Sequence, residues 1–141
     1  MFVLIVGCGR VGSTVAKAML ADCHDVSVLD EDPEAIALLE RGSQQSWEES
    51  GGTFTVGTAI EMDALIEAGI ERADAFVAST DGDNTNLVIA QIAQRRFGVE
   101  RVIARVLDPA RAAWYAEQGL ETICPTQFAI TEFERALGVG T

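Results

Sequence analysis

The sequence has little positive charge. It holds 10 lysine and arginine residues against 22 aspartate and glutamate residues, a formal net charge of −12 at pH 7. DNA, RNA and anionic lipid surfaces are polyanions, and proteins bind them mainly through clusters of basic side chains. The charge balance therefore argues against nucleic acid as a partner. It also means that an anionic small molecule must be held by local groups, because the overall field of the protein repels it.

Long apolar runs and cysteines are also scarce. No apolar run approaches the roughly 18 residues that a transmembrane helix needs, and the apolar N-terminus is typical of a strand and not of a signal peptide. The three cysteines, Cys8, Cys23 and Cys124, show no metal-ligand spacing. We therefore expect a cytoplasmic protein with reduced thiols, no metal centre and no direct membrane insertion. A length of 141 residues, 48% of them apolar, fits one domain with a sizeable core and leaves no room for a second.

The first thirty residues predict a strand, a glycine-rich turn, a helix and a second strand. Residues 2–6 are a continuous apolar run, and residues 26–30 form a second strand that ends in Asp30. Between them, apolar residues recur at the helical spacing of four over residues 11–19. Asp30 lies eighteen residues beyond Gly12. The stretch is therefore a complete βαβ unit.

The turn reads Gly-Cys-Gly-Arg-Val-Gly over residues 7–12, the spacing of a dinucleotide-binding turn. Gly7 can take backbone angles closed to other residues, Gly9 lets the main chain approach a pyrophosphate, and Gly12 lets the helix pack close to the strand. The helix N-terminus stabilises an anion by roughly 0.3–1 kcal/mol, and Asp30 would accept hydrogen bonds from ribose hydroxyls. A tight turn without a ligand is the alternative, but the intact βαβ unit favours nucleotide binding.

The rest of the chain repeats the alternation of strand and helix. Residues 42–52, rich in Gly, Ser, Gln and Glu around Trp47, predict a loop or a frayed helix extension. Asp32, Asp83 and Asp108 are each expected to cap the helix that follows them. The expected strands are residues 2–6, 26–30, 53–56, 73–78, 101–106 and 122–124. Six strands alternating with helices predict an α/β fold, a doubly wound parallel six-stranded sheet of Rossmann-like type.

Two later turns are expected at the same edge of the sheet as the glycine turn. Parallel sheets bind ligands at the carboxyl ends of their strands, where Thr58 and Ala59 follow the third strand and Ser79 and Thr80 follow the fourth. The predicted cofactor-binding residues are Gly7, Cys8, Gly9, Arg10, Val11, Gly12, Asp30, Glu31, Thr58, Ala59, Ser79, Thr80 and Arg105.

The charged residues of this set leave some choices open. Arg10 can read a phosphate or be a solvated surface residue, and Arg105, near the end of the fifth strand, can face the phosphates or pair with one of the many acids. Glu31 and Asp32 beside Asp30 would repel a 2′-phosphate, and no arginine neighbours this strand end. We therefore expect NAD(H) to be preferred over its phosphorylated form.

A small NAD-dependent oxidoreductase, or the cofactor-binding fragment of one, is the competing interpretation. Such enzymes add a substrate-binding segment and a positioned acid or base to the cofactor domain. The one histidine, His24, is expected at the edge opposite the glycine turn, and Tyr115 has no lysine near it in sequence, since Lys17 is the only lysine. The sequence therefore favours a sensor with no catalytic residues.

Several motifs occur together along the chain. They are residues 7–12, Asp30-x-Asp32-Pro33, Val56-Gly57 followed by Ala68-Gly69-Ile70, residues 73–77 leading to Asp83-Asn84-x-Asn86, and residues 103–109. On these motifs the chain resembles the N-terminal nucleotide-binding domain of the TrkA/KtrA family, also called the RCK or KTN domain. The resemblance implies a cytoplasmic regulatory subunit of a membrane potassium channel or transporter that binds NAD(H), ATP or ADP. Thr58 departs from the pattern, because the family usually has an aspartate there, near the adenine ring.

The end of the chain predicts an amphipathic helix. Ala129, Phe133, Ala136 and Leu137 share one face, and the sheet is already complete before this helix begins. The apolar face needs a partner unless the helix packs on its own sheet. The resemblance implies a helix that crosses to a second subunit of a homodimer or higher homo-oligomer, with Arg10 close to the neighbour's nucleotide. We therefore expect a nucleotide-binding domain over residues 1–124 and a crossover helix over residues 125–141, without the family's C-terminal regulatory domain.

Overall fold

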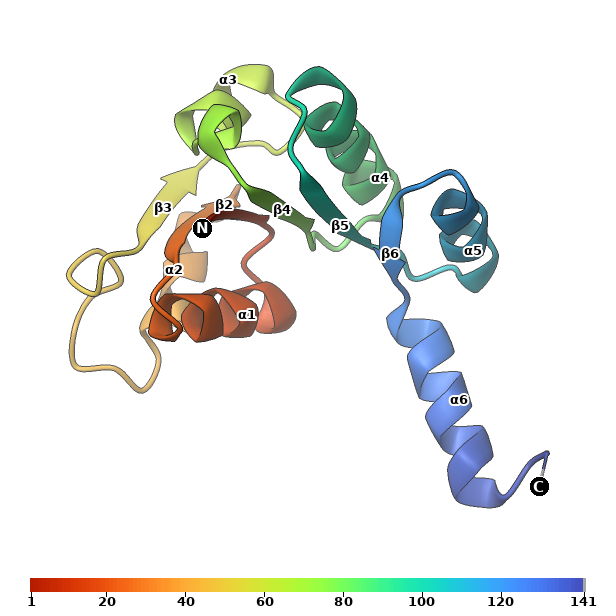
Figure 1. The fold of residues 1–141 in the computed structure, drawn as a ribbon. Helices are drawn as coiled ribbons and strands as arrows, with labels where there is room; N and C mark the ends of the chain where they lie inside the picture. The colour runs from red at the N-terminus through yellow and green to blue at the C-terminus, as the bar shows by residue number, and fades with distance from the viewer. Residues whose placement is uncertain (141) are drawn as a thin grey trace.

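The central sheet has six parallel strands in the order β3-β2-β1-β4-β5-β6 in the computed structural model, which describes residues 1–140 (Figure 1). The order reverses between β1 and β4, as in doubly wound dinucleotide-binding folds. The predicted fold class is confirmed. The strands are β1 (Phe2–Val6), β2 (Asp25–Asp30), β3 (Thr53–Val56), β4 (Ala75–Ala78), β5 (Arg101–Arg105) and β6 (Glu121–Ile123).

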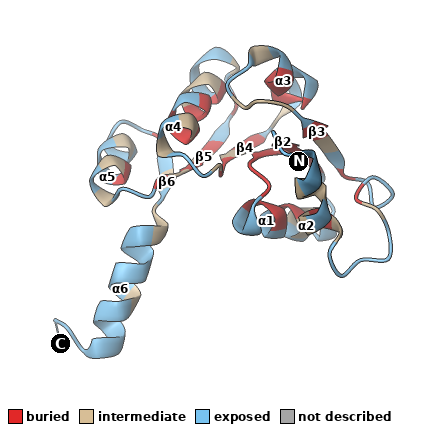
Figure 2. Ribbon diagram, turned by 180° about the vertical axis from the view of Figure 1, so that it is seen from behind, coloured by how far each residue is buried: buried red, intermediate tan, exposed pale blue. Residues whose placement is uncertain are grey.

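Helices cover both faces of the sheet (Figures 1 and 2). The helices α1 and α2 pack on one face, and α3, α4 and α5 pack on the other. The helices are α1 (Arg10–Ala21), α2 (Ile36–Glu40), α3 (Met62–Glu67), α4 (Asp83–Gln91), α5 (Pro109–Glu117) and α6 (Pro125–Leu137), with short turns η1 (Pro33–Ala35), η2 (Ile70–Arg72) and a π-helical η3 (Ile92–Arg96).

The central strand β1 contributes to both hydrophobic cores. Val3 and Ile5 pack under α1 and α2, whereas Leu4 and Val6 pack under α3 and α4, and all four are at most 2% exposed. A parallel strand covered on both faces has no solvent side, which explains why the sequence here is a continuous apolar run and not an alternating one.

Five predicted strand ends differ from the structure: β2 and β6 each begin one residue earlier than predicted, β5 ends one residue early, and the start of β4 and the end of β6 have a clear local cause. β4 begins at Ala75, two residues later than predicted, because the Ala73 N–H bonds the Ile70 carbonyl oxygen and closes a short helical turn. β6 ends at Ile123, one residue early, because Cys124 is already the N-cap of α6. Local hydrogen bonds therefore take residues that the apolar pattern assigns to strands.

The loop between α2 and β3 is organised around Trp47. This side chain is only 2% exposed, its indole Nε1 donates to the Thr53 carbonyl oxygen at 3.0 Å, and its backbone N–H donates to Glu40 Oε2 at 2.8 Å. A Cβ atom at Gly52 would overlap the indole ring. The loop is therefore folded onto the core. The sequence predicted a loop here but not its buried anchor.

The last helix, α6, projects from the domain (Figures 1 and 2). It has no buried residue, and its apolar side chains Phe128 and Phe133 are both 70% exposed. In this single chain α6 therefore does not pack on its own sheet, which was the alternative considered above. Residue 141, the last of the predicted crossover segment, lies outside the described residues.

Over residues 1–140, no helix combines the length and the apolar character required to cross a membrane.

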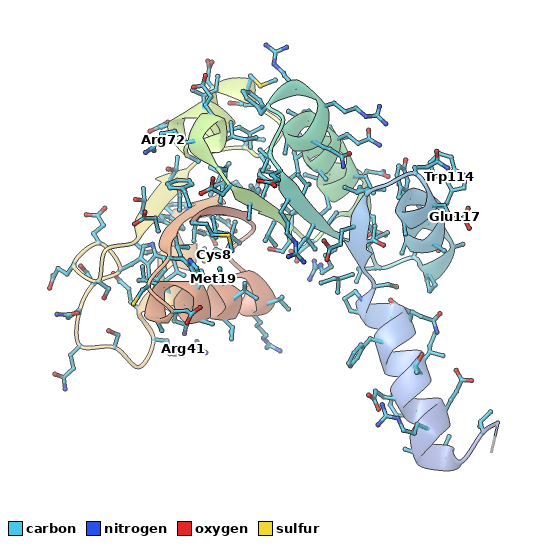
Figure 3. All side chains as sticks on the ribbon, viewed as in Figure 1. Cys8, Met19, Arg41, Arg72, Trp114 and Glu117 are labelled. Atoms are coloured by element: carbon cyan, nitrogen blue, oxygen red, sulfur yellow. The ribbon has the colours of Figure 1, made fainter. Side chains whose placement is uncertain are left out.

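Replacing Trp47 by alanine is expected to lower the free energy of unfolding by about 3–5 kcal/mol, because it leaves a cavity in the core and an unpaired Thr53 carbonyl. Trp114 is the matched control, since it points outward from α5 and is 55% exposed (Figure 3). Trp114→Ala should cost less than about 1 kcal/mol. Urea unfolding followed by circular dichroism measures both, and equal costs would contradict the anchoring role.

Candidate functional site

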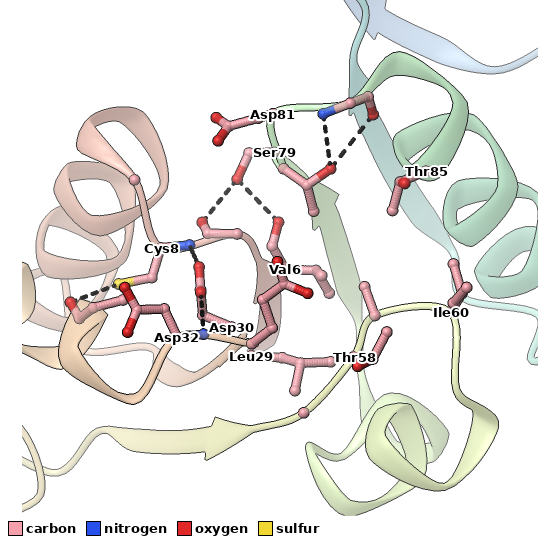
Figure 4. A pocket seen from close by; sticks show the side chains of 18 residues that line it. Val6, Cys8, Leu29, Asp30, Asp32, Thr58, Ile60, Ser79, Asp81 and Thr85 are labelled. Atoms are coloured by element: carbon pink, nitrogen blue, oxygen red, sulfur yellow. Dashed lines mark hydrogen bonds between the residues drawn. The ribbon is translucent and has the colours of Figure 1, made fainter.

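A cleft lies at the carboxyl edge of the sheet, where the strand order reverses between β1 and β4 (Figure 4). It has a volume of about 510 Å³. Four strand-end segments line it, together with Ala35 and Thr85: residues 6–9 from the end of β1, residues 29–32 from the end of β2, residues 57–60 after β3 and residues 79–82 after β4. The residues that follow four different strands thus meet in one place because the sheet is parallel.

The three glycines of the β1–α1 turn serve different purposes. Gly7 has a φ of +105°, and a Cβ there would lie 2.5 Å from the Ser79 main chain. A Cβ at Gly12 would overlap the Gly7 carbonyl oxygen. A Cβ at Gly9 would meet nothing within 4 Å, and the φ of Gly9, −85°, is open to any residue. Gly7 and Gly12 are thus required by packing, whereas Gly9 keeps space open at the cleft.

Two helices begin at the cleft without a side-chain cap. Of the four helices with nine or more residues, α5 and α6 are capped by the side chains of Asp108 and Cys124. The N-caps of α1 and α4 are Gly9 and Gly82, which line the cleft and have no side chain to offer. The first N–H groups of α1 and α4 are therefore left for solvent or an anion, with the positive ends of both helix dipoles at the cleft.

The Asp30 carboxylate joins the end of β2 to the glycine turn (Figure 4). Its Oδ2 accepts the Cys8 N–H at 2.7 Å, and its Oδ1 accepts the Asp32 N–H at 2.9 Å. A carboxylate oxygen can accept more than one hydrogen bond, so Asp30 can still accept a hydrogen bond from a ligand hydroxyl. Glu31 and Asp32 add further negative charge at this wall.

The Cys8 thiol is buried beside Asp30 and donates to the Ala35 carbonyl oxygen at 3.4 Å. Burial, and then the negative charge of Asp30, raise the pKa of Cys8 from 9.0 to about 11. The neutral thiol is therefore the form present at physiological pH. Since the thiolate is the nucleophilic form of cysteine, Cys8 lines the cleft as a small apolar group.

The β4–α4 turn is tied to the protein by the side chains that were predicted to face a ligand. Ser79 Oγ lies 3.2 Å from the Val6 carbonyl oxygen and 3.1 Å from the Gly7 carbonyl oxygen. Thr80 Oγ1 bonds Asn86 Oδ1 at 2.6 Å, and the Thr80 N–H bonds the same oxygen at 2.9 Å. Both residues line the cleft, but their hydroxyls also hold the turn in place.

Arg105 lies outside the cleft lining. Its Nη2 donates to the Thr80 carbonyl oxygen and lies 3.6 Å from Asp81 Oδ1, while its buried Nε has no hydrogen-bond partner in the described chain. Pairing with an acid, Asp81, is thus the alternative that the structure shows.

Nine of the thirteen predicted site residues line the cleft, namely Gly7, Cys8, Gly9, Asp30, Glu31, Thr58, Ala59, Ser79 and Thr80. Gly12 lies beneath the turn, and Arg10 and Val11 are exposed on the first turn of α1. The lining residues that the sequence did not single out include Ile60, Asp81 and Thr85. Ile60 and Asp81 follow directly after predicted residues in the same turns, so the strand-end rule would have found them if applied over four residues, whereas Thr85 lies in the first turn of α4 and would not have been found in this way.

The predicted capping role of Asp83 is wrong. Gly82 is the N-cap of α4, and the Asp83 carboxylate instead accepts the Leu107 N–H at 2.8 Å and the Asp108 N–H at 3.1 Å. Asp83 is already inside the helix, one residue too late to cap it, and the neighbouring β5–α5 turn offers two N–H groups in succession. Sequence spacing alone does not show a partner that is 24 residues away.

The one histidine lies outside the cleft. His24 lies at the amino edge of the sheet, as predicted, where its Nε2 is 3.2 Å from Asp22 Oδ2 and its Nδ1 is 3.1 Å from the N-terminal amine. Within residues 1–140, no group of three or more His, Cys, Asp or Glu side chains is arranged to hold a metal ion.

The strand order, the glycine turn and the acidic end of β2 define a Rossmann-type domain. Within that class, the chain belongs to the TrkA-N domain family, whose model matches residues 3–125. It is 41% identical over 137 residues to the Trk system potassium uptake protein TrkA of Streptomyces coelicolor. The alignment covers 97% of this chain and 58% of that protein. The chain thus spans little more than half of that relative's length. The resemblance to the TrkA/KtrA family is confirmed.

Two solved structures share the fold. A Kef C-terminal domain of Shewanella denitrificans in an AMP-bound form is 24% identical, with a TM-score of 0.76, and the alignment covers 100% of this chain and 83% of that one. GsuK bound to ADP is 18% identical, with a TM-score of 0.76, over 96% of this chain and 33% of that one.

Iodoacetamide at pH 8 is expected to label Cys23, which is exposed, far faster than Cys8. Only about a thousandth of a thiol with a pKa near 11 is ionised at that pH, against about a quarter of a free cysteine. A labelling time course read by peptide mass spectrometry compares the two sites in one sample. Labelling of Cys8 in the folded protein at a rate similar to Cys23 would contradict the burial and the raised pKa.

Proposed function

We propose that this chain binds NAD(H) or an adenine nucleotide such as ADP or ATP in the cleft, and that it is the nucleotide-sensing part of a regulator of potassium transport. The observation that carries the proposal is the meeting of two uncapped helix N-termini, those of α1 and α4, at one cleft that also holds the Asp30 carboxylate. Phosphate is stabilised by helix N-termini, and a strand-end acid is suited to ribose hydroxyls.

The cleft suggests an order for the parts of the ligand. The phosphates lie over Gly9, where a Cβ would find open space. The ribose lies at Asp30, and the base extends towards the β3–α3 turn, where Thr58, Ala59 and Ile60 line the wall. Arg10 and Arg105 lie outside the lining, so in this arrangement main-chain N–H groups and not arginines make the first contacts with phosphate.

The acids beside Asp30 support a preference for NAD(H) over NADP(H). Glu31 and Asp32 line the cleft next to the expected ribose, whereas none of the arginines is among the lining residues. A 2′-phosphate there would face like charge without a cation to pair with it. The protein's net charge of −12 adds to this repulsion.

The relatives support the regulatory role. The similar Streptomyces coelicolor protein is a Trk system potassium uptake protein, and proteins of the same fold have been solved with AMP and with ADP. We propose that this chain likewise acts on a membrane potassium channel or transporter from the cytoplasmic side. A role as an oxidoreductase is not favoured, because His24 lies at the far edge of the sheet, where it would not reach a nicotinamide in the cleft.

We further propose that residues 1–124 form the nucleotide-binding domain and that α6 is the contact to a second copy of the chain. Leu137 is 79% exposed, and Phe128 and Phe133 are each 70% exposed. An isolated amphipathic helix gains little from its own sequence and is normally stabilised by burying its apolar face. A second subunit that covers α6 would make the protein a homodimer or a higher homo-oligomer.

NAD at millimolar concentration is expected to raise the melting temperature, and NADP to raise it less. Gly9→Ala should melt within a few degrees of the wild type, because the new Cβ meets only open space, yet lose most of the shift with NAD. Gly82→Ala, which also leaves room for the new Cβ, tests the N-terminus of α4 in the same way. Gly98 is not used as a control position, because its φ of +61° would strain an alanine. No shift with NAD, ADP or ATP would refute the nucleotide site, and equal shifts with NAD and NADP would refute the preference.

Sedimentation at about 10 μM is expected to show a dimer or larger species, in the affinity range of ordinary protein interfaces. Phe133→Glu places a charge in the proposed contact and should shift the protein to monomer with little change in domain stability. Val88→Glu, at a position 47% exposed on α4, is the control and should leave the assembly intact. A wild-type protein that remains monomeric at this concentration would contradict the proposed contact.

A further inference from the structure

The cleft-lining turn after β4 is bonded on its other side to the turn after β5. Asp83 follows directly after the lining residue Gly82, and its two carboxylate oxygens accept the N–H groups of Leu107 and Asp108 at 2.8 and 3.1 Å. One side chain thus holds two successive N–H groups. A shift of the β4–α4 turn therefore pulls the β5–α5 turn with it or breaks one of these bonds.

The peptide group between Leu107 and Asp108 is held at both ends. Its N–H, on Asp108, bonds Asp83, and its carbonyl oxygen, on Leu107, lies 3.5 Å from the Cys124 thiol that donates to it. A peptide group is planar and turns as one unit. If this peptide group rotates when Asp83 moves, its carbonyl oxygen, to which the Cys124 thiol is bonded, must move as well.

Cys124 is in turn the N-cap of α6. Its Sγ accepts the Gln127 N–H at 3.3 Å, in the first turn of the helix. Since α6 has no buried residue, its direction relative to the sheet depends on the groups at its root. The same sulfur thus bonds both the Leu107–Asp108 peptide and the start of the projecting helix.

The turns after β4 and β5 are further joined by a buried amide. Asn86 is 0% exposed; its Oδ1 accepts the Thr80 N–H, and its Nδ2 donates to the Arg105 carbonyl oxygen at 2.9 Å. At the surface, Arg111 on α5 donates to Asn84 Oδ1 at 2.7 Å. These bonds make the two turns one connected unit between the cleft and β6.

We propose that occupancy of the cleft is transmitted to α6 along this route, through Asp83, the Leu107–Asp108 peptide and Cys124. The inference rests on the proposed nucleotide site and names how that site is coupled to assembly. A ligand that bonds the main chain of residues 79–82 shifts this turn, Asp83 carries the shift to the peptide, and the root of α6 changes its hydrogen bonding. A nucleotide thereby biases the arrangement of the subunits that meet on α6.

Hydrogen exchange with mass spectrometry tests the route. The probe is whichever of NAD and ADP gives the larger thermal shift, at saturating concentration. In the wild type, the ligand should change amide exchange by about fivefold or more, a typical allosteric coupling, in residues 79–85 and also in residues 124–130. Asp83→Asn replaces one accepting oxygen by a donor, so it should retain the change in residues 79–85 and lose most of the change in residues 124–130.

Two further variants distinguish loss of the coupling between the cleft and α6 from a general loss of stability. Cys124→Ala removes the thiol link without touching the cleft and should have the same effect as Asp83→Asn. Asp63→Asn, in the first turn of α3, makes the same charge change away from the route and should behave as the wild type. Ligand affinity should stay within about twofold in Cys124→Ala and Asp63→Asn, since neither residue is in the cleft lining.

The outcomes are distinct. A change in residues 124–130 that persists at full size in both Asp83→Asn and Cys124→Ala overturns the route, as does a wild type that responds in residues 79–85 only. Absence of ligand binding overturns the proposed nucleotide site and this inference with it.

Discussion

The close approach of α1 to the end of β1 is the constraint on which the rest of the structure depends. Gly12 packs so near the Gly7 carbonyl that no side chain fits between them, and Gly7 in turn packs against the Ser79 main chain. These contacts bring the start of α1 and the β4–α4 turn to the same point of the sheet. The cleft, to which two helix N-termini and the acidic end of β2 contribute, is a consequence of this packing.

This packing also explains how a strongly acidic protein could hold an anion. The overall field of a molecule with a net charge of −12 repels phosphate. Helix N-termini act over a short range, within the first turn, and need no basic side chain. The uncapped starts of α1 and α4 concentrate such groups at the cleft, while Arg105 Nη2 lies 3.6 Å from Asp81 Oδ1, one of the lining acids. These N–H groups therefore give the turn a local attraction for an anion that the field of the whole molecule lacks.

The sequence predicted most of what depends on short-range patterns. The six strands, the glycine turn and the capping of η1 by Asp32 and of α5 by Asp108 follow from apolar runs and local spacing, and the structure contains all of them. It did not predict the partners of Asp83, the pairing of Arg105 with the β4–α4 turn, or the burial of Trp47. Each of these depends on groups that are far apart in sequence and that the tertiary fold brings together. The sequence offers many acids and carbonyl groups as partners and does not show which one is near.

The sheet and α6 differ sharply in how far their apolar residues are buried. In the sheet, apolar residues are covered on both faces, so a change at β1 is resisted by close packing. In α6, apolar residues are exposed and the helix joins the domain at the Cys124 cap, so its direction can change at much lower cost than the sheet can deform. A signal that begins at the rigid cleft would therefore be expressed as a change in the orientation of α6. If a second subunit covers the exposed apolar side chains of α6, a small rotation at the start of the helix moves the whole contact surface. The rotation then changes the position of the second subunit.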